Sequence, residues 1–188
     1  MTPAERQPVA GSEREADALL VATCRTSALI QVRGRGSFKV GPALKQFGLS
    51  AMSSGCRQFI VDMDECTGMD STFMGVLAGL ALRLKREQSG RMVMMNLSAK
   101  TLALLETLGL ARLIETYLEG SVSADLQKCL SDVVDVSALK GSVADKKLTL
   151  ETMLAAHEDL VKVSPDNLPK FENVMAYLSA DLKQFEGV

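Results

Sequence analysis

Four acidic side chains and two hydroxyls lie close together in the stretch FIVDMDECTGMDSTFMGVLAGLALRLK, residues 59–85. The acidic residues are Asp62, Asp64, Glu65 and Asp70, and the two hydroxyls directly after the last of them are Ser71 and Thr72. Neighbouring carboxylates can hold magnesium and act as nucleophile and acid/base in phosphoryl transfer. A hydroxyl in the first turn of a helix can instead accept a phosphate as a switch. The stretch therefore predicts a catalytic carboxylate site, a phosphorylation site, or simply the capped start of a buried helix.

The catalytic alternative depends on Asp62-Met63-Asp64, which follows a short apolar run. This motif resembles the first motif of haloacid-dehalogenase-type phosphatases. The resemblance implies Asp62 as nucleophile and Asp64 as acid/base beside magnesium. That family has Thr two residues after the second Asp, whereas this chain has Cys66 there and Thr67 one residue later. A helix that begins near residue 71 also leaves little room for that family's inserted flap, so the phosphatase is the third-ranked hypothesis.

The composition of the chain argues against several classes of function. The chain has 188 residues, 47% of them hydrophobic, and a net charge of −2, with no cluster of Lys and Arg of the kind that nucleic-acid binding requires. Four cysteines without CxxC spacing and the single histidine, His157, argue against a structural zinc site, and we expect no metal and no cofactor. The longest uncharged apolar stretch, 73–82, is too short to span a bilayer, and the polar residues 1–16 do not resemble a secretory signal. We expect a flexible N-terminus and a cytoplasmic protein.

Residues 17–120 contain alternating strand and helix patterns that predict one α/β domain. Strands are expected at 18–23 and 28–33, which form a hairpin, and at 58–63, 91–96 and 113–118. Helices are expected from Pro42 towards Gly55, from Ser71 to Gly90 with Asp70 as N-cap, and from Ala99 with Ser98 as N-cap. This order predicts a mixed β-sheet with right-handed parallel βαβ units.

Residues 121–188 form a predicted helical extension, because the strand signals stop at Gly120. Three helices are expected, at 123–134, 148–163 and 168–185. The last two carry apolar stripes, and an exposed apolar patch of that size usually marks an interaction surface. We therefore expect them to pair with each other and to cover either the domain or a second copy, as in a homodimer. His157 lies in one stripe and is interpreted as a helix–helix packing residue.

The motif Met69-Asp70-Ser71-Thr72-Phe73-Met74-Gly75-Val76-Leu77 resembles the signature of STAS domains of the anti-sigma-factor antagonist type. That signature is an apolar residue, Asp, Ser, Ser or Thr, two variable positions, Gly and then aliphatic residues, at the start of the helix that follows the third strand. The strand RMVMMN and the helix SAKTLALLETLGL follow in the family's order, so the resemblance covers residues 18–120 and implies a STAS-like fold.

The resemblance implies a regulatory hydroxyl that a cognate kinase phosphorylates, often the anti-sigma factor itself. Motif matching places it on Thr72, with Ser71 as the second candidate and Asp70 as the capping acid. The chain departs from the family pattern in having Thr as acceptor and the bulky Phe73 after it. Because the apolar stripe begins only at Phe73, we expect the Thr72 hydroxyl to be exposed.

The partner-binding residues are expected around this hydroxyl. They comprise the acidic loop, Gly75 on the helix, and polar residues of the glycine-containing loop 34–41: Asp62, Asp64, Glu65, Asp70, Gly75, Arg35, Ser37 and Lys39. The loop could also be an ordinary turn, and Gly75 and Gly79 could serve close packing against the sheet.

The sequence thus predicts a phosphorylation-gated protein-interaction module and not an enzyme. The resemblance implies partner switching in transcriptional or stress signalling, with an anti-sigma factor or a serine/threonine kinase as partner. The second hypothesis is a non-phosphorylated STAS scaffold subunit of a membrane-transporter or signalling complex.

Overall fold

A mixed sheet forms the centre of the computed structural model, which describes residues 17–88, 90–121, 126, 136–140 and 145–186. The strands are β1 (Ala18–Cys24), β2 (Ser27–Gly36), β3 (Gln58–Asp62), β4 (Cys66–Met69), β5 (Arg91–Leu97), β6 (Glu115–Leu118) and β7 (Ser137–Lys140). Their order is β6-β5-β3-β2-β1-β7, and β4 pairs with β2 outside this path. The β1–β2 pair is antiparallel, and β2–β3, β3–β5 and β5–β6 are parallel. The predicted α/β fold with a mixed sheet is confirmed.

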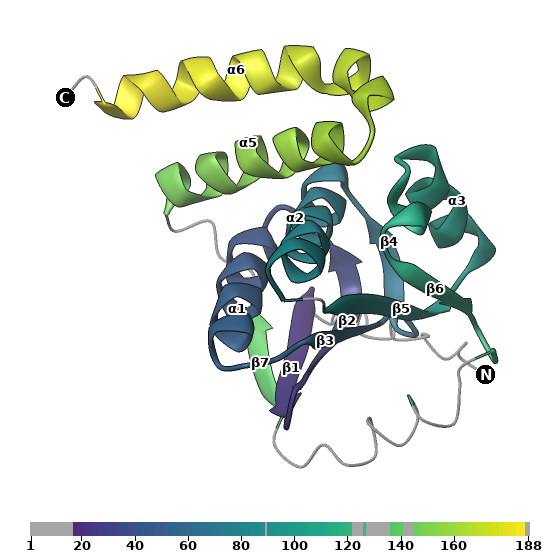
Figure 1. Ribbon diagram of the computed structural model, residues 1–188. Helices are drawn as coiled ribbons and strands as arrows, with labels where there is room; N and C mark the ends of the chain where they lie inside the picture. Colours follow the sequence, from purple (N-terminus) through teal and green to yellow (C-terminus); the bar gives the residue numbers. More distant parts are fainter. Residues whose placement is uncertain (1–16, 89, 122–125, 127–135, 141–144, 187–188) are drawn as a thin grey trace, which may run out of the picture.

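Within the part of the chain that the structure describes, three helices connect the strands. They are α1 (Gly41–Ser53), α2 (Ser71–Gln88) and α3 (Ala99–Thr107), and α1 and α2 lie side by side against the sheet in Figure 1. Pro42 stands in the first turn of α1, and the Ser98 hydroxyl accepts a hydrogen bond from the Thr101 backbone N–H at 3.1 Å at the start of α3, as predicted. The core between helices and sheet is apolar and includes the fully buried Phe59, Phe73, Leu44, Leu77 and Leu84.

The two C-terminal helices form a hairpin over the domain. α5 (Lys146–Val163) packs on α2 and α1, and α6 (Leu168–Glu186) packs on α5 on the side away from the sheet (Figure 1). At the turn, the Asn167 side chain donates to the backbone carbonyls of Leu108 and Leu160, at 3.0 and 2.9 Å. The prediction that these helices pair and cover the domain is confirmed, while association with a second copy stays a prediction.

One expectation about the extension is wrong. Strand pairing does not stop at Gly120, because β7 lies beyond it and pairs antiparallel with β1 at the edge of the sheet. A four-residue strand carries too short a pattern to be recognised, and its backbone hydrogen bonds depend on an open edge that the sequence does not reveal. The predicted helix at 123–134 lies outside the described residues except for Leu126, and so does the N-terminal segment 1–16.

Candidate functional site

Asp70 organises the start of α2. One carboxylate oxygen accepts the backbone N–H of Phe73 at 2.9 Å, which caps the helix, and the other accepts the N–H of Phe38 at 2.8 Å. The backbone N–H of Asp70 donates to the Gly36 carbonyl at 3.0 Å. The predicted N-cap is confirmed, and the same side chain fixes the loop after β2 against the first turn of α2.

Thr72 is not exposed, and this prediction is wrong. The residue is buried, with 3% of its surface accessible. A Cβ atom on Gly41 of α1 would lie 3.6 Å from Thr72 Cγ2 and 3.7 Å from Thr152 Cγ2, so Thr72 and Thr152 of α5 both pack beside Gly41. The local pattern could not show this burial, because the residues that pack beside it, such as Gly41, come from distant parts of the chain.

Ser71 contacts α5 through a hydrogen bond. Its hydroxyl lies 2.9 Å from His157 Nε2, and His157 Nδ1 lies 2.7 Å from the Met153 carbonyl oxygen. A carbonyl oxygen only accepts, so Nδ1 carries the ring proton in the neutral imidazole. Nε2 is then the acceptor, and the Ser71 hydroxyl donates to it. Sequence reasoning missed this pair, because nothing in either local pattern links the two residues.

His157 is a buried packing residue, as predicted. Its ring lies 5.0 Å from that of Phe171 in a tilted arrangement, and 3% of the residue is accessible. Burial lowers the pKa of the imidazole from its ordinary 6.5, while the hydrogen bond to Met153 and the negative charge of Asp70 act in the opposite direction. The neutral form described above is therefore the one that the fold favours.

This lowered pKa predicts a pH dependence of stability. Below about pH 6.5 the unfolded chain takes up a proton on His157 that the folded chain resists, so stability is complete above that pH and is lost as the pH falls. We expect the urea midpoint to decrease between pH 7.5 and 5.5, and His157→Gln to flatten that change. His157 is the only histidine, which makes the comparison specific. An identical pH profile in both proteins would contradict the assignment.

The acidic loop does not form one cluster. Asp62 accepts a hydrogen bond from the Asn96 side chain at 2.8 Å, next to β5, whereas Glu65 pairs with Arg33 of β2 at 3.2 Å. Asp64 is exposed and its backbone N–H donates to Asp62. Within the described residues no group of three or more His, Cys, Asp or Glu side chains could hold a metal ion. The loop borders the start of α2 as a set of separate carboxylates.

The loop after β2 reaches the same region. Ser37 is buried, and its hydroxyl has no hydrogen-bond partner among the described atoms. Arg35 and Lys39 are exposed, and the backbone N–H of Arg35 donates to Asp17 at 2.9 Å. Of the predicted residues in this loop, Ser37 lies inside the fold, whereas the two cations face outward.

Gly75 and Gly79 allow a close approach, but to α5 and not to the sheet. A Cβ atom on Gly75 would stand 2.6 Å from the carbonyl carbon and 2.7 Å from the Cβ of Ala156. On Gly79 it would meet the Asp159 carboxylate and lie 3.1 Å from its Cγ. The predicted partner surface of α2 is therefore occupied by the protein's own helix α5.

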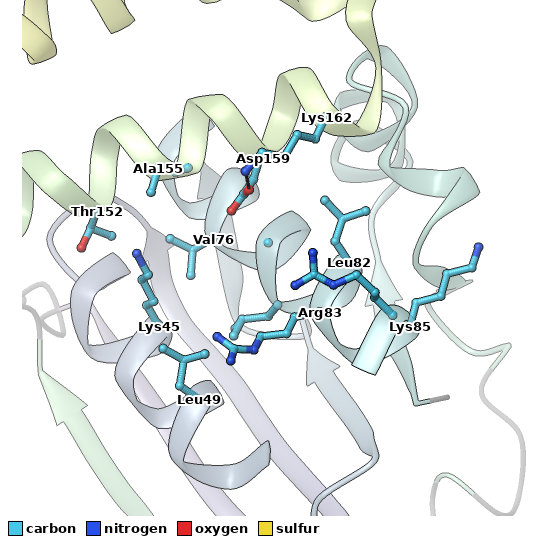
Figure 2. A pocket seen from close by; sticks show the side chains of 14 residues that line it. Lys45, Leu49, Val76, Leu82, Arg83, Lys85, Thr152, Ala155, Asp159 and Lys162 are labelled. Atoms are coloured by element: carbon cyan, nitrogen blue, oxygen red, sulfur yellow. Dashed lines mark hydrogen bonds and ion pairs between the residues drawn. The ribbon is translucent and has the colours of Figure 1, made fainter. Parts of the chain in front are cut away.

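A groove of about 490 Å³ remains where α1, α2 and α5 meet. In Figure 2, Lys45 reaches up from α1 and Asp159 points down from α5, while Lys85 extends away along the rim. Asp159 pairs with Lys162 of the same helix at 2.8 Å. The groove has an apolar floor and more cations than carboxylates, and its lining includes Leu49, Val76, Leu80, Arg83, Ala155 and Thr152.

This sheet and the capped helix define a class of domain found in anti-sigma factor antagonists. The unphosphorylated form of SpoIIAA aligns with a TM-score of 0.50 and 14% identity over 62% of this chain and 99% of its own. A putative antagonist from Thermotoga maritima (TM-score 0.49, 11% identity, 60% and 92% coverage) and one from Mycobacterium paratuberculosis (0.48, 18%, 61% and 93%) are also similar. At these identities the likeness concerns the fold.

The family follows from the sequence itself. Residues 20–115 match the family described as "Mlab, STAS domain", a span of just over half of the chain. The chain therefore belongs to the STAS domain family, as the motif at 69–77 indicated. A comparison with curated protein sequences gives no match. No described helix is long and apolar enough to cross a membrane.

Proposed function

We propose that the protein is a phosphorylation-gated interaction module that works by partner switching, in the manner of an anti-sigma-factor antagonist. The observation that carries the proposal is the hydroxyl pair Ser71 and Thr72, which directly follows the Asp70 cap at the start of α2 in a STAS domain. Backbone N–H groups and the positive end of the helix dipole favour a phosphate there. The helix itself would tolerate the modification.

The proposed partner is a protein, either an anti-sigma factor or a serine/threonine kinase, and the proposed setting is cytoplasmic signalling without a cofactor or nucleic acid. A phosphate adds about two negative charges beside Asp70. If it meets a partner carboxylate at about 6 Å with an effective dielectric near 20, each unit charge opposes binding by roughly 3 kcal/mol. That corresponds to roughly a hundredfold in affinity.

Two hydroxyls compete for the acceptor role. The family motif favours Thr72, but that residue is buried, and Ser71 is the more accessible of the two. Phosphate on Ser71 would also remove the proton that now bonds to His157. Modification of either hydroxyl would therefore disturb the contact with α5.

A second candidate is a scaffold subunit that is never phosphorylated. The burial of Thr72 is the specific observation in its favour, because a kinase cannot reach a buried hydroxyl in the folded chain. Both candidates use the domain as a binding module, and they differ in whether a phosphate controls it.

Capture of the tagged full-length protein from its native cells, with phosphatase inhibitors present, distinguishes the two candidates. Mass spectrometry is expected to find phosphate on Ser71 or Thr72 and to identify the co-purifying protein. That protein should bind the unmodified chain at least about a hundredfold more tightly than the phosphorylated chain. When the phosphorylated residue is replaced by alanine, the partner should stay bound after kinase treatment. Equal affinity for modified and unmodified chains would reject the switch and favour the scaffold.

A further inference from the structure

The contact between α2 and α5 has two features of a docking surface. Gly75 presents bare backbone to the Ala156 carbonyl of α5, and Gly79 makes room for the Asp159 carboxylate. Glycine inside a helix costs about 1 kcal/mol relative to alanine, so two of them four residues apart indicate a face shaped for a close neighbour. The neighbour that fits is a helix with a small residue and, one turn later, a carboxylate.

The fit of α5 on this face leaves one of its own polar groups without a partner. The Thr152 hydroxyl, on a residue with 1% of its surface accessible, lacks a hydrogen bond among the described atoms. Buried hydroxyls of this kind are uncommon in native cores, because each loses its bond to water without a replacement. Moving α5 away would return the Thr152 hydroxyl to water.

The two ends of α5 are held differently. Near its C-terminal end, Asn167 bonds two backbone carbonyls, one of them at the end of α3. Over the start of α2, the Ser71 hydroxyl donates a hydrogen bond to His157 of α5. The part of α5 that lies over α2 can therefore separate from the domain while the turn stays attached.

We propose that this face of α2 is a helix-docking surface, that α5 occupies it as an internal competitor, and that the protein partner displaces α5 with a helix of the same chemistry. The partner helix carries a small residue against Gly75 and a carboxylate against Gly79. The basic rim of the neighbouring groove, which includes Lys45, complements further acidic residues on it. The proposal rests on the proposed function only in taking the partner to be a protein.

Displacement of α5 also determines access to the hydroxyls. In the closed arrangement Thr72 is buried and Ser71 is bonded to His157. In the open arrangement both hydroxyls face solvent. A partner helix and a modifying enzyme therefore both bind the molecules in which α5 has separated from α2. The fraction of such molecules before binding sets the apparent affinity of the partner and of the enzyme.

The opening of α5 can be measured on the full chain with Thr152→Cys as reporter. This cysteine would be the only one between Leu148 and Lys162, and the hydroxyl that it replaces makes no hydrogen bond. Peptide-resolved labelling with N-ethylmaleimide then reports the open fraction. Gly75→Ala should accelerate labelling about tenfold or more, because the new methyl group meets the Ala156 backbone. His157→Ala should act in the same direction.

Gly68→Ala is the matched control, because a Cβ atom there meets nothing within 4 Å. It should leave labelling unchanged. Alanine favours helix over glycine, so Gly75→Ala should open α5 without lowering the melting temperature of the sheet. This separates opening from unfolding. Equal labelling rates in Gly75→Ala, His157→Ala and Gly68→Ala would overturn the proposal.

The chemistry of the partner is tested with a labelled peptide of the α5 sequence, residues 146–163. Fluorescence anisotropy should show it binding the full-length His157→Ala protein at least about tenfold more tightly than wild type, where the internal helix competes. A peptide with Ala156→Leu and Asp159→Lys should bind neither protein. Equal binding of both peptides would contradict the small-residue and carboxylate recognition. A dimeric mass in light scattering would instead identify the occupant as α5 of a second copy and overturn the internal competition. None of these results depends on phosphorylation.

Discussion

Thr72→Glu is expected to release α5 and α6 from the domain while the sheet stays folded. Thr72 is buried beside Gly41 and Thr152, so a glutamate there brings a charge without a partner into the packed contact. Burying an uncompensated charge costs several kcal/mol, and separation of α5 relieves it. Had Thr72 been exposed, the same charge would have been stabilised by the helix dipole. Because Thr72 is buried, the added charge is expected to destabilise the contact with α5 and not to stabilise the helix.

Hydrogen exchange measured along the chain tests this result. Amides of α5 and α6 should exchange about a hundredfold faster in Thr72→Glu, the factor for roughly 3 kcal/mol, while those of β3 and β5 keep their protection. Thr67→Glu is the matched control, because it adds the same charge on an exposed residue of β4. Unchanged exchange in α5, or equal acceleration in both variants, would contradict the role given to Thr72 burial.

Phe73→Ala is expected to reduce the free energy of unfolding by about 3–5 kcal/mol. Phe73 is fully buried in the first turn of α2. Its ring packs on Gly36 at the end of β2: a Cβ atom there would lie 2.7 Å from Phe73 Cδ1 and 2.8 Å from Cε1. The large Phe73 side chain at the start of α2 therefore fits only because Gly36 on β2 has no side chain.

The pairing predicts a coupling that denaturant unfolding can measure. Gly36→Ala alone should cost roughly 1–3 kcal/mol, because the new methyl group overlaps the ring. Combining it with Phe73→Leu should recover part of that loss, since the smaller side chain leaves room. The two single effects would then fail to add. Additivity within about 0.5 kcal/mol would show that the two positions are independent.

Local signals in the sequence determined most of the domain. Periodicity and turn residues placed the β1–β2 hairpin, α2 and β5, and the caps Asp70 and Ser98 act as their residue types predict. The apolar stripes of α5 and α6 likewise required a covered surface, which the structure provides. These features follow from short-range physics, because a cap or a stripe depends on residues within a few positions of one another. The motif at 69–77 identified the family for the same reason.

Tertiary packing alone decided which surfaces face each other, and with them the state of the site. Ser71 and His157 are 86 positions apart, and no local pattern relates them. The residues around Thr72 predicted an exposed hydroxyl, and the folded chain buries it. β7 depends on the open edge of β1, and Gly75 on the backbone of Ala156, so neither could be interpreted before the chain was folded. Packing and sheet pairing join residues distant in sequence, whereas sequence patterns report each element separately.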